Sequence, residues 1–323
     1  MTIILGIDIS KAKFDVTFLN VDKPHQTFDN TQKGFEAFLK ALGPVSEITV
    51  GLEATGIYGE NLCQFLYDQR CRVFLLNPAP VKFYGKSMMK RAKTDKADSA
   101  LIAHFVASHQ EELTPWHPKS DTLATLQNLQ SCLTDLKEDR QRVSGRIEAC
   151  NHTDRAGRPE AFKSYNEQRE FLEKQIQKVQ NLLLSLVESE EDLKKQYEAL
   201  VSIEGVGSAT ALGLLAMLPD LSHFSHAKQL TAFAGLNPAV KQSGSSVRGR
   251  GSISKQGNAD LRKLLYMPAL SAKHHNKILS VFAKGLEERG KPAKVITTAV
   301  MRKLLHYIFY LLKKGGATLK PAS

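Results

Sequence analysis

The chain has 323 residues, of which 42% are hydrophobic and 24% are charged, a composition typical of a folded globular protein rather than a disordered or fibrous one. This length is sufficient for two domains with hydrophobic cores of their own. The formal net charge of +11 is concentrated near the C-terminus, where residues 201–323 carry 18 Lys and Arg against 5 Asp and Glu. Such an excess indicates contact with nucleic acid phosphates, and a basic surface that serves only solubility is the alternative.

Several other classes of protein are disfavoured. The four cysteines have neither CxxC nor CxxH spacing, which argues against a structural zinc site and indicates reduced thiols in a cytoplasmic protein. The N-terminal segment MTIILGIDIS lacks the pattern of a secretory signal. The apolar stretch LLHYIFYLL is too short to cross a bilayer. We therefore expect neither secretion nor a membrane partner.

The first third predicts an α/β domain. Runs rich in β-branched or alternating apolar residues predict strands, and Pro78 and Pro80 stop the last of them. The order β-β-β-α-β-α-β-α is typical of a mixed sheet with helices on both faces and matches the topology of the RNase H-like fold. The predicted elements are strands at 2–10, 13–20, 26–30 and 47–53 and before Pro78, and helices at 31–42, 57–69 and across 78–108.

The middle of the chain predicts a helical hairpin. Apolar residues alternate at spacings of three and four from Leu126 to residue 147 and again from Leu172 to Leu200, and a polar stretch with Gly157 and Pro159 separates the two runs. This pattern predicts two long antiparallel helices, a coiled-coil arm joined near 150–160. The arm serves either dimerisation and nucleic acid bridging or only as an intramolecular spacer.

The last third predicts a mostly helical, basic domain. The string IEGVG, which contains Gly205 and Gly207, resembles the turn of a helix-hairpin-helix element, which binds phosphate through backbone N–H groups. Residues 241–258 are rich in Gly, Ser and Arg, and we expect a functional or disordered loop there. The predicted domains are therefore 1–115, an α/β sheet domain, 116–199, a helical hairpin, and 200–323, a mostly helical domain.

Four carboxylates form a candidate metal site. Asp8 and Glu53 end strands that are neighbours in an RNase H-like sheet, and Asp95 and Asp98 share one face of a helix within a basic run. Converging carboxylates repel one another unless cations bind, and one or two Mg²⁺ ions held by such oxygens can clamp a phosphodiester. The alternatives are a turn cap for Asp8, a helix cap for Glu53 and a solvated mixed-charge helix for the pair.

Five ordered motifs resemble a known family. They are GIDISKAKFDV, LEATGIYGENL, KTDKADSALIA, AFAGLNPAVKQSGSSVRGRGSISKQGNADLRKLLY and KVITTAVMRKLLHYIFYLLKKG. Together they look like the DEDD recombinases of bacterial insertion sequences, the group that includes the Piv-type DNA invertases. The resemblance covers nearly the whole chain. It implies a RuvC-like N-terminal domain and a C-terminal transposase domain that contributes a serine.

The resemblance also implies chemistry and partners. It assigns Asp8, Glu53, Asp95 and Asp98 to Mg²⁺ binding and Ser243 to nucleophilic attack on DNA, giving a phosphoserine link that a second DNA end resolves. A serine hydroxyl needs activation, and the metal site is the candidate activator, whereas a flexible Gly/Ser loop is the alternative for Ser243. The implied partners are donor and target DNA, a noncoding bridge RNA as in several members, and a second copy in a homodimer or dimer of dimers, in the cytoplasm at the nucleoid. The basic residues expected to contact nucleic acid are Lys90, Arg91, Lys93, Lys96, Arg248, Arg250, Lys255, Arg262 and Lys263.

Three other functions stay open. A RuvC-like nuclease would hydrolyse branched DNA with the four carboxylates and would not need Ser243. GIDIS also resembles the phosphate loop of actin and sugar-kinase folds, but the further Gly-rich nucleotide loops of those folds are not found in the sequence. A non-enzymatic basic scaffold would bind nucleic acid whether or not Asp8 is intact.

Overall fold

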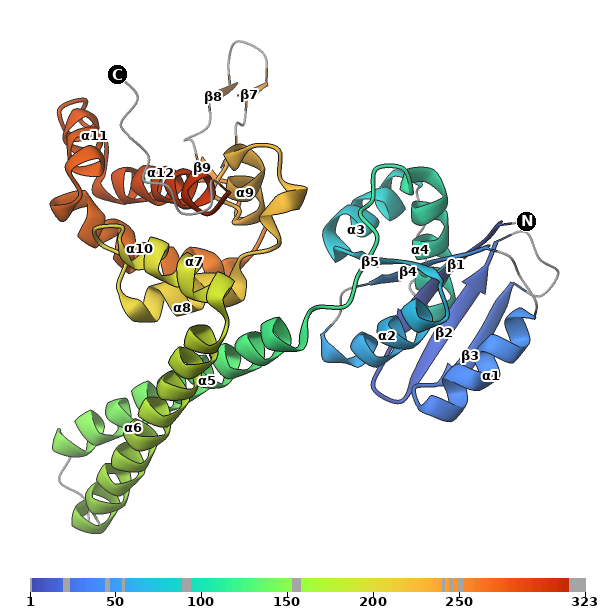
Figure 1. Cartoon of the computed structure of the whole chain (residues 1–323), viewed down its shortest axis with the longest axis horizontal. Helices are drawn as coiled ribbons and strands as arrows, with labels where there is room; N and C mark the ends of the chain where they lie inside the picture. Colours follow the sequence, from blue (N-terminus) through green and yellow to red (C-terminus); the bar gives the residue numbers. More distant parts are fainter. Residues whose placement is uncertain are drawn as a thin grey trace. The chain divides into compact units, whose positions relative to one another are not determined.

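The computed structural model describes two compact units, Met1–Lys119 and Ser120–Ser323, here called the N-terminal and C-terminal units. The N-terminal unit is a mixed sheet with helices, and the C-terminal unit is mostly helical (Figure 1). The described residues are 2–19, 24–43, 47–53, 56–88, 94–152, 158–239, 242–243, 247–248 and 252–313, and within them the side chains of Thr2, Ile57, Asp95, His223, Gln242, Ser243, Val247 and Arg248 are excluded.

The N-terminal unit is built on a five-stranded sheet in the order β3-β2-β1-β4-β5. The central strand β1 pairs antiparallel with β2 and parallel with β4, as predicted. Leu5 and Ile7 of β1 are completely buried because both of their neighbouring strands and the helices beyond cover them. The strands are β1 (Thr2–Ile9), β2 (Lys13–Phe18), β3 (His25–Asp29), β4 (Glu47–Glu53) and β5 (Arg72–Leu76).

Helices cover both faces of this sheet. On one face, Phe38 of α1 and Leu66 of α2 pack in the same core as Leu5 and Ile7. On the opposite face, Phe74 of β5 packs with residues of α3 and α4. Thr31 caps α1 by accepting a hydrogen bond from the Gly34 N–H, and Asn77 caps α3, which has Pro in its first turn. The helices are α1 (Gln32–Leu42), the short 3₁₀ helix η1 (Ile57–Gly59), α2 (Glu60–Asp68), α3 (Pro78–Ser87) and α4 (Asp95–His109).

The predicted pair of long helices is present in the C-terminal unit, but the second ends at Ser189, and the part predicted to continue to Leu200 is a separate helix, α7 (Glu191–Val201). Helices α5 (Asp121–Asn151) and α6 (Arg158–Ser189) lie side by side (Figure 1). Leu126 and Leu133 of α5 share one core with Leu183 of α6 and with helices further along the chain. The hairpin and the C-terminal helices therefore belong to one compact unit. The predicted boundary between a hairpin domain (116–199) and a C-terminal domain (200–323) stays a prediction.

The remaining helices surround α12, which is a core helix. Leu304, Leu305 and Ile308 of α12 are fully buried among them. By length and composition alone α12 could cross a membrane, because it extends well beyond the apolar stretch considered in the sequence, but half of its apolar window is buried inside this unit. The helices are α7 (Glu191–Val201), α8 (Ser208–Met217), η2 (Leu221–His223), α9 (Ala227–Phe233), α10 (Ala259–His275), α11 (Lys277–Glu287) and α12 (Ala293–Lys313).

The segment expected as a loop, 241–258, contains three short strands, and a fourth lies just before it. β6 (Pro238–Ala239) pairs with β9 (Ser252–Ile253), and β7 (Gln242–Ser243) pairs with β8 (Val247–Arg248). Strands of two residues are too short to show an alternating apolar pattern, so the sequence did not indicate them. Ser243 is thus placed on a short ladder, paired in register with Val247.

Burial predicts a strong difference in reactivity among the four free cysteines. Burial raises the pKa of Cys63 to about 12, with Glu60 adding to the effect, and raises the pKa of Cys71 to about 11. Because the thiolate is the reactive form, a thiol reagent at mildly alkaline pH should label exposed Cys132 rapidly and leave Cys63 and Cys71 intact until the protein unfolds. The fast phase should shrink in Cys132→Ser to the contribution of half-buried Cys150, and rapid labelling of Cys63 would contradict the expectation.

Candidate active site

Asp8 and Glu53 lie at the carboxyl ends of neighbouring parallel strands. The register pairs Ile7 with Leu52, so these two acidic residues occupy the next position on each strand. Adjacent strands are about 4.8 Å apart and side chains in register point to the same face. Both residues are half-buried. The sequence-based expectation that these two residues end adjacent strands is confirmed.

Helix α4 covers the face on which these two residues lie. A Cβ added at Gly6 would overlap the backbone of Ser99 and Ala103, and one added at Gly51 would overlap the Val106 side chain. Gly6 and Asp8, like Gly51 and Glu53, are two residues apart and therefore share a face. The two glycines let the helix lie directly on the strands.

The N-terminal end of α4 points toward the carboxyl ends of β1 and β4. Ile4, early in β1, packs against the cluster that includes Ile102, Phe105 and Val106 of α4, whereas Gly6, further along β1, meets Ser99 and Ala103 nearer the start of the helix. The Thr94 side chain begins the helix by accepting a hydrogen bond of 3.1 Å from the Ala97 N–H. Asp95 is the first residue of the helix, and half-buried Asp98 lies one turn further on.

Convergence of all four carboxylates on one ion stays a prediction. The Asp95 side chain lies outside the described residues, and among those that are described no three Asp, Glu, His or Cys side chains form a group able to hold a metal ion. What the structure supplies is the position of each element: two strand ends and the start of a helix on one face of the sheet.

A buried hydrogen bond holds α4 on the sheet. The hydroxyls of Thr17 and Ser99 are 2.8 Å apart, and both residues are buried, with exposures of 6% and 0%. Thr17 is in register with Gly6, so this bond lies beside the closest approach of helix and sheet. Ser99 directly follows Asp98, and the bond therefore fixes the helical turn that carries this carboxylate.

Asp15 is a fifth carboxylate on this face, and the sequence analysis did not select it. It is in register with Asp8 across the β1–β2 pair and is only 5% exposed. It accepts a hydrogen bond of 2.6 Å from Thr27 and lies 3.5 Å from the Lys13 ammonium and 3.3 Å from His25 Nε2. The sequence did contain a signal for it: in the alternating strand 13–18, Asp15 lies on the face opposite Phe14 and Val16. The Lys13 ammonium offsets its charge, and the Thr27 hydroxyl donates a hydrogen bond to it.

Hydrogen bonds join the two ends of the chain segment that carries Ser243. The Arg262 guanidinium donates to the carbonyls of Ala234 at 2.9 Å, Gly257 at 3.1 Å and Asn258 at 3.3 Å. Ser254 donates to Asn237 at 2.6 Å across the β6–β9 pair. These bonds close the base of the segment that carries β7 and β8.

The predicted nucleic acid contacts fall into three groups. Arg262 and Lys263 bind groups within the protein. Arg262 donates to the backbone carbonyls described above, and the Lys263 ammonium lies 2.7 Å from Glu138 of α5 and lowers the pKa of that carboxyl. Lys96 and Lys255 are exposed, and Lys255 has a positive φ of 56°. Nucleic acid contact by all of them stays a prediction. Lys90, Arg91, Lys93 and Arg250, together with the Arg248 side chain, lie outside the described residues.

The IEGVG turn joins α7 to α8 as the helix-hairpin-helix interpretation requires. Gly205 has a φ of 102°, and a Cβ there would overlap the backbone of Ala272 in α10. This glycine is therefore required by the turn and by packing. Helix α8 starts at Gly207 without a side-chain cap, with Ser208 and Ala209 exposed.

Sequence comparison relates the chain to transposases and to DNA-inverting proteins. A family model described as "Transposase", of the IS110 DEDD type, matches residues 5–150, and one described as "Transposase IS116/IS110/IS902 family" matches residues 197–284. The pilin gene-inverting proteins of Moraxella lacunata and Moraxella bovis are each 31% identical over 317 residues, which is 96% of this chain and 96% of theirs. The chain belongs to the IS110 family of transposases.

A further relative matches over a shorter range with a similar percentage of identical residues. The transposase for insertion sequence element IS1111A of Coxiella burnetii is 33% identical over 148 residues, 45% of this chain and 35% of that protein. Asp8, Glu53, Asp95 and Asp98 all fall within the first matched family range, and Ser243 falls within the second.

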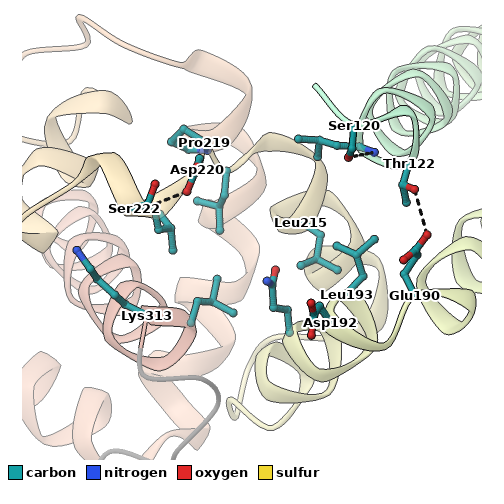
Figure 2. Close-up of a pocket in the computed structure, with 15 residues that line it drawn as sticks. Ser120, Thr122, Glu190, Asp192, Leu193, Leu215, Pro219, Asp220, Ser222 and Lys313 are labelled. Atoms are coloured by element: carbon teal, nitrogen blue, oxygen red, sulfur yellow. Dashed lines mark hydrogen bonds between the residues drawn. The ribbon is translucent and has the colours of Figure 1, made fainter. Parts of the chain in front are cut away.

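The cavity in Figure 2 is chemically unsuited to nucleic acid. It encloses about 650 Å³ in the C-terminal unit, between the start of α5, α7, α8 and the end of α12. Among the described residues, three carboxylates, Glu190, Asp192 and Asp220, and one cation, Lys313, line it. Thr122 donates to Glu190 at 3.2 Å. This negative lining disfavours phosphate, and the predicted site residues that the structure describes do not line it.

The Thr17–Ser99 bond predicts a measurable coupling. Ser99→Ala should lower the free energy of unfolding by about 1–3 kcal/mol because it leaves the buried Thr17 hydroxyl unpaired. Adding Thr17→Val should recover part of this loss, since both polar groups are then gone. Trp116, the single tryptophan, packs against the N-terminal core. Its fluorescence therefore reports denaturant unfolding of this unit. Strictly additive effects of the two substitutions would contradict the coupling.

Proposed function

We propose that this IS110-family protein is a DNA transposase of an insertion sequence that cuts and rejoins DNA through a phosphoserine link at Ser243. In this proposal a divalent metal site of Asp8, Glu53, Asp95 and Asp98 assists the chemistry. The observation that carries the proposal is the meeting of the carboxyl ends of β1 and β4 with the starting end of α4 on one face of the sheet. The near full-length similarity to pilin gene-inverting proteins supports recombination as the reaction.

We further propose that the N-terminal unit has the RNase H-like, RuvC-like fold. The strand order β3-β2-β1-β4-β5 supports it, with the first three strands antiparallel and β1, β4 and β5 parallel. In this topology Asp8 lies on the central strand and Glu53 on the strand beside it. The sheet thus offers a rigid base for chemistry on a phosphodiester.

The donor set fits a hard divalent cation. Asp8 and Glu53 provide carboxylate oxygens from adjacent strands, and Asp98 provides another from a helix that the Thr17–Ser99 bond holds in place. When bound, Mg²⁺ supplies Lewis-acid polarisation of a phosphoryl oxygen and lowers the pKa of a coordinated hydroxyl. The protein's task is to hold these oxygens in a fixed arrangement, which buried neighbours on both strands support.

The serine chemistry balances without water. The Ser243 oxygen attacks a DNA phosphorus, the bond to one sugar oxygen breaks, and that oxygen leaves as a hydroxyl after taking up a proton. The hydroxyl of a second DNA end then attacks the phosphoserine, restores a phosphodiester and releases the serine. One phosphodiester is exchanged for another, so no net hydrolysis occurs and no external energy source is required.

The proposed partners are donor DNA, target DNA and a noncoding bridge RNA, with the protein acting as a homodimer or dimer of dimers in the cytoplasm. The strongly basic last third of the chain supports contact with polynucleotides. The paired helices α5 and α6 offer an elongated surface for a second copy, which supports the dimer. If an RNA selects the DNA by base pairing, the protein needs only shape and backbone contacts.

Replacement of the serine separates recombination from hydrolysis. Ser243→Ala should abolish covalent protein–DNA product and strand exchange, because it removes the hydroxyl proposed to attack the phosphorus. Ser252→Ala, on the exposed strand β9 of the same segment, is the matched control and should retain both. Denaturing gels of labelled DNA detect the covalent product. Nicking by Ser243→Ala at the wild-type rate, with no protein attached to DNA, would show a hydrolytic nuclease instead.

Replacement of a carboxylate tests the metal site. Asp8→Asn should lower the cleavage rate by at least about 100-fold, since it removes a charged oxygen that would hold the divalent ion. Its affinity for DNA should stay close to that of the wild type, and chelation of divalent ions should abolish the wild-type activity. Asp68→Asn on the exposed end of α2 is the control. Full activity of Asp8→Asn would contradict the proposed site.

A further inference from the structure

Two segments of the C-terminal unit lack acidic residues entirely. Residues 221–259 contain five Lys and Arg, residues 289–323 contain eight, and neither segment contains Asp or Glu. The first segment includes α9 and the second includes α12. These two helices pack against each other, so the fold gathers positive charge that the sequence keeps apart.

Four basic side chains meet where α9 and α12 pack. Lys228 lies in the first turn of α9, and Arg302, Lys303 and His306 lie on α12, with Arg302 and His306 one helical turn apart. Burial lowers the pKa of His306, and the charges of Arg302, Lys303 and Lys228 lower it further. The charged groups that act on this imidazole are therefore all cations. We call these four residues the α9–α12 cluster.

Polar atoms of the cluster are buried without partners. Arg302 Nε and His306 Nε2 have no hydrogen-bond partner in the described part of the chain. The Lys303 ammonium lies 5.4 Å from the centre of the Phe282 ring of α11 and forms no ion pair among the described residues. By contrast, Lys195, Lys263 and Lys273 of the same unit are each paired with a glutamate.

An arrangement of this kind favours an anionic ligand. Like charges held together cost free energy, and buried donors without acceptors add to that cost. A phosphodiester would offset the repulsion, because the partly exposed Arg302 guanidinium and the exposed Lys228 and Lys303 ammonium groups carry positive charge and can donate hydrogen bonds to phosphate oxygens.

We propose that the α9–α12 cluster binds a phosphodiester group of a polynucleotide. The inference rests on the proposed function and names a contact surface for its nucleic acid. Helix α9 is followed along the chain by β6 and by the strand that carries Ser243, and the cluster and Ser243 belong to the same unit. Cleavage at Ser243 needs a strand held nearby, and the cluster supplies a contact that is independent of base sequence.

The test compares two charge-matched double variants of the full chain. Arg302→Gln combined with Lys228→Gln removes two cations from the cluster, and Lys194→Gln combined with Lys195→Gln removes two from the exposed face of α7. Binding is measured by fluorescence anisotropy over a range of salt concentrations. One probe is a labelled DNA duplex of arbitrary sequence, and the other is a labelled RNA hairpin. The probe whose binding changes identifies the source of the phosphodiester.

The cluster variant should bind at least about 10-fold more weakly at low salt. The slope of log K against log salt should become shallower by about 2, close to one unit for each lost phosphate contact. The α7 control should keep the wild-type slope, and Arg302→Lys, which retains the charge, should keep most of it. Because Arg302 has no carboxylate partner among the described residues, thermal stability of the cluster variant should be unchanged or higher.

Two results would overturn the inference. Equal affinity and slope for the cluster variant and the wild type with both probes would show that the α9–α12 cluster does not contact phosphate, while the proposed function would stand. Failure of the wild-type protein to bind either probe would remove the proposed function and the cluster with it. An equal loss in the α7 control would show a general effect of net charge and would also reject a specific site.

Discussion

The N-terminal unit depends on the direct contact between α4 and the two central strands β1 and β4. This contact is possible because Gly6 and Gly51 have no side chains on the face that the helix covers. A helix held at a normal distance by larger residues would leave its first turn further from the strand ends. The contact therefore sets where Asp98 lies relative to Asp8 and Glu53. The buried Thr17–Ser99 bond fixes the helix along its axis at the same place.

The two units differ in the sign of the charge that they concentrate. The N-terminal unit concentrates carboxylates on one face of its sheet and offsets Asp15 with Lys13. The C-terminal unit has two long segments without acidic residues and packs them together. A phosphodiester at this face of the N-terminal unit would meet repulsion unless cations bind there, which is the physical reason for the metal-assisted mechanism proposed above.

Cations in the C-terminal unit serve two different purposes. Lys263 pairs with Glu138 and ties α10 to the helical hairpin, and Arg262 binds backbone carbonyls at the base of the β7–β8 segment. Both were predicted to contact nucleic acid from charge alone. Lys228 and Arg302 lack such partners among the described residues, and neither was predicted from the sequence to contact nucleic acid. The presence or absence of a carboxylate neighbour thus separates structural cations from candidates for ligand binding.

The sequence by itself determined the elements and the candidate chemistry. Alternation of apolar residues predicted the strands, the three-and-four spacing predicted α5 and α6, and strand-end positions singled out Asp8 and Glu53, because such periods arise from local geometry. The tertiary structure alone decided the register that sets Asp15 beside Asp8, the Thr17–Ser99 bond, the short ladder under Ser243 and the meeting of Lys228 with Arg302. These features join residues that are separated along the chain, or involve two-residue strands. Neither leaves a periodic pattern, since such contacts depend on packing over the whole unit.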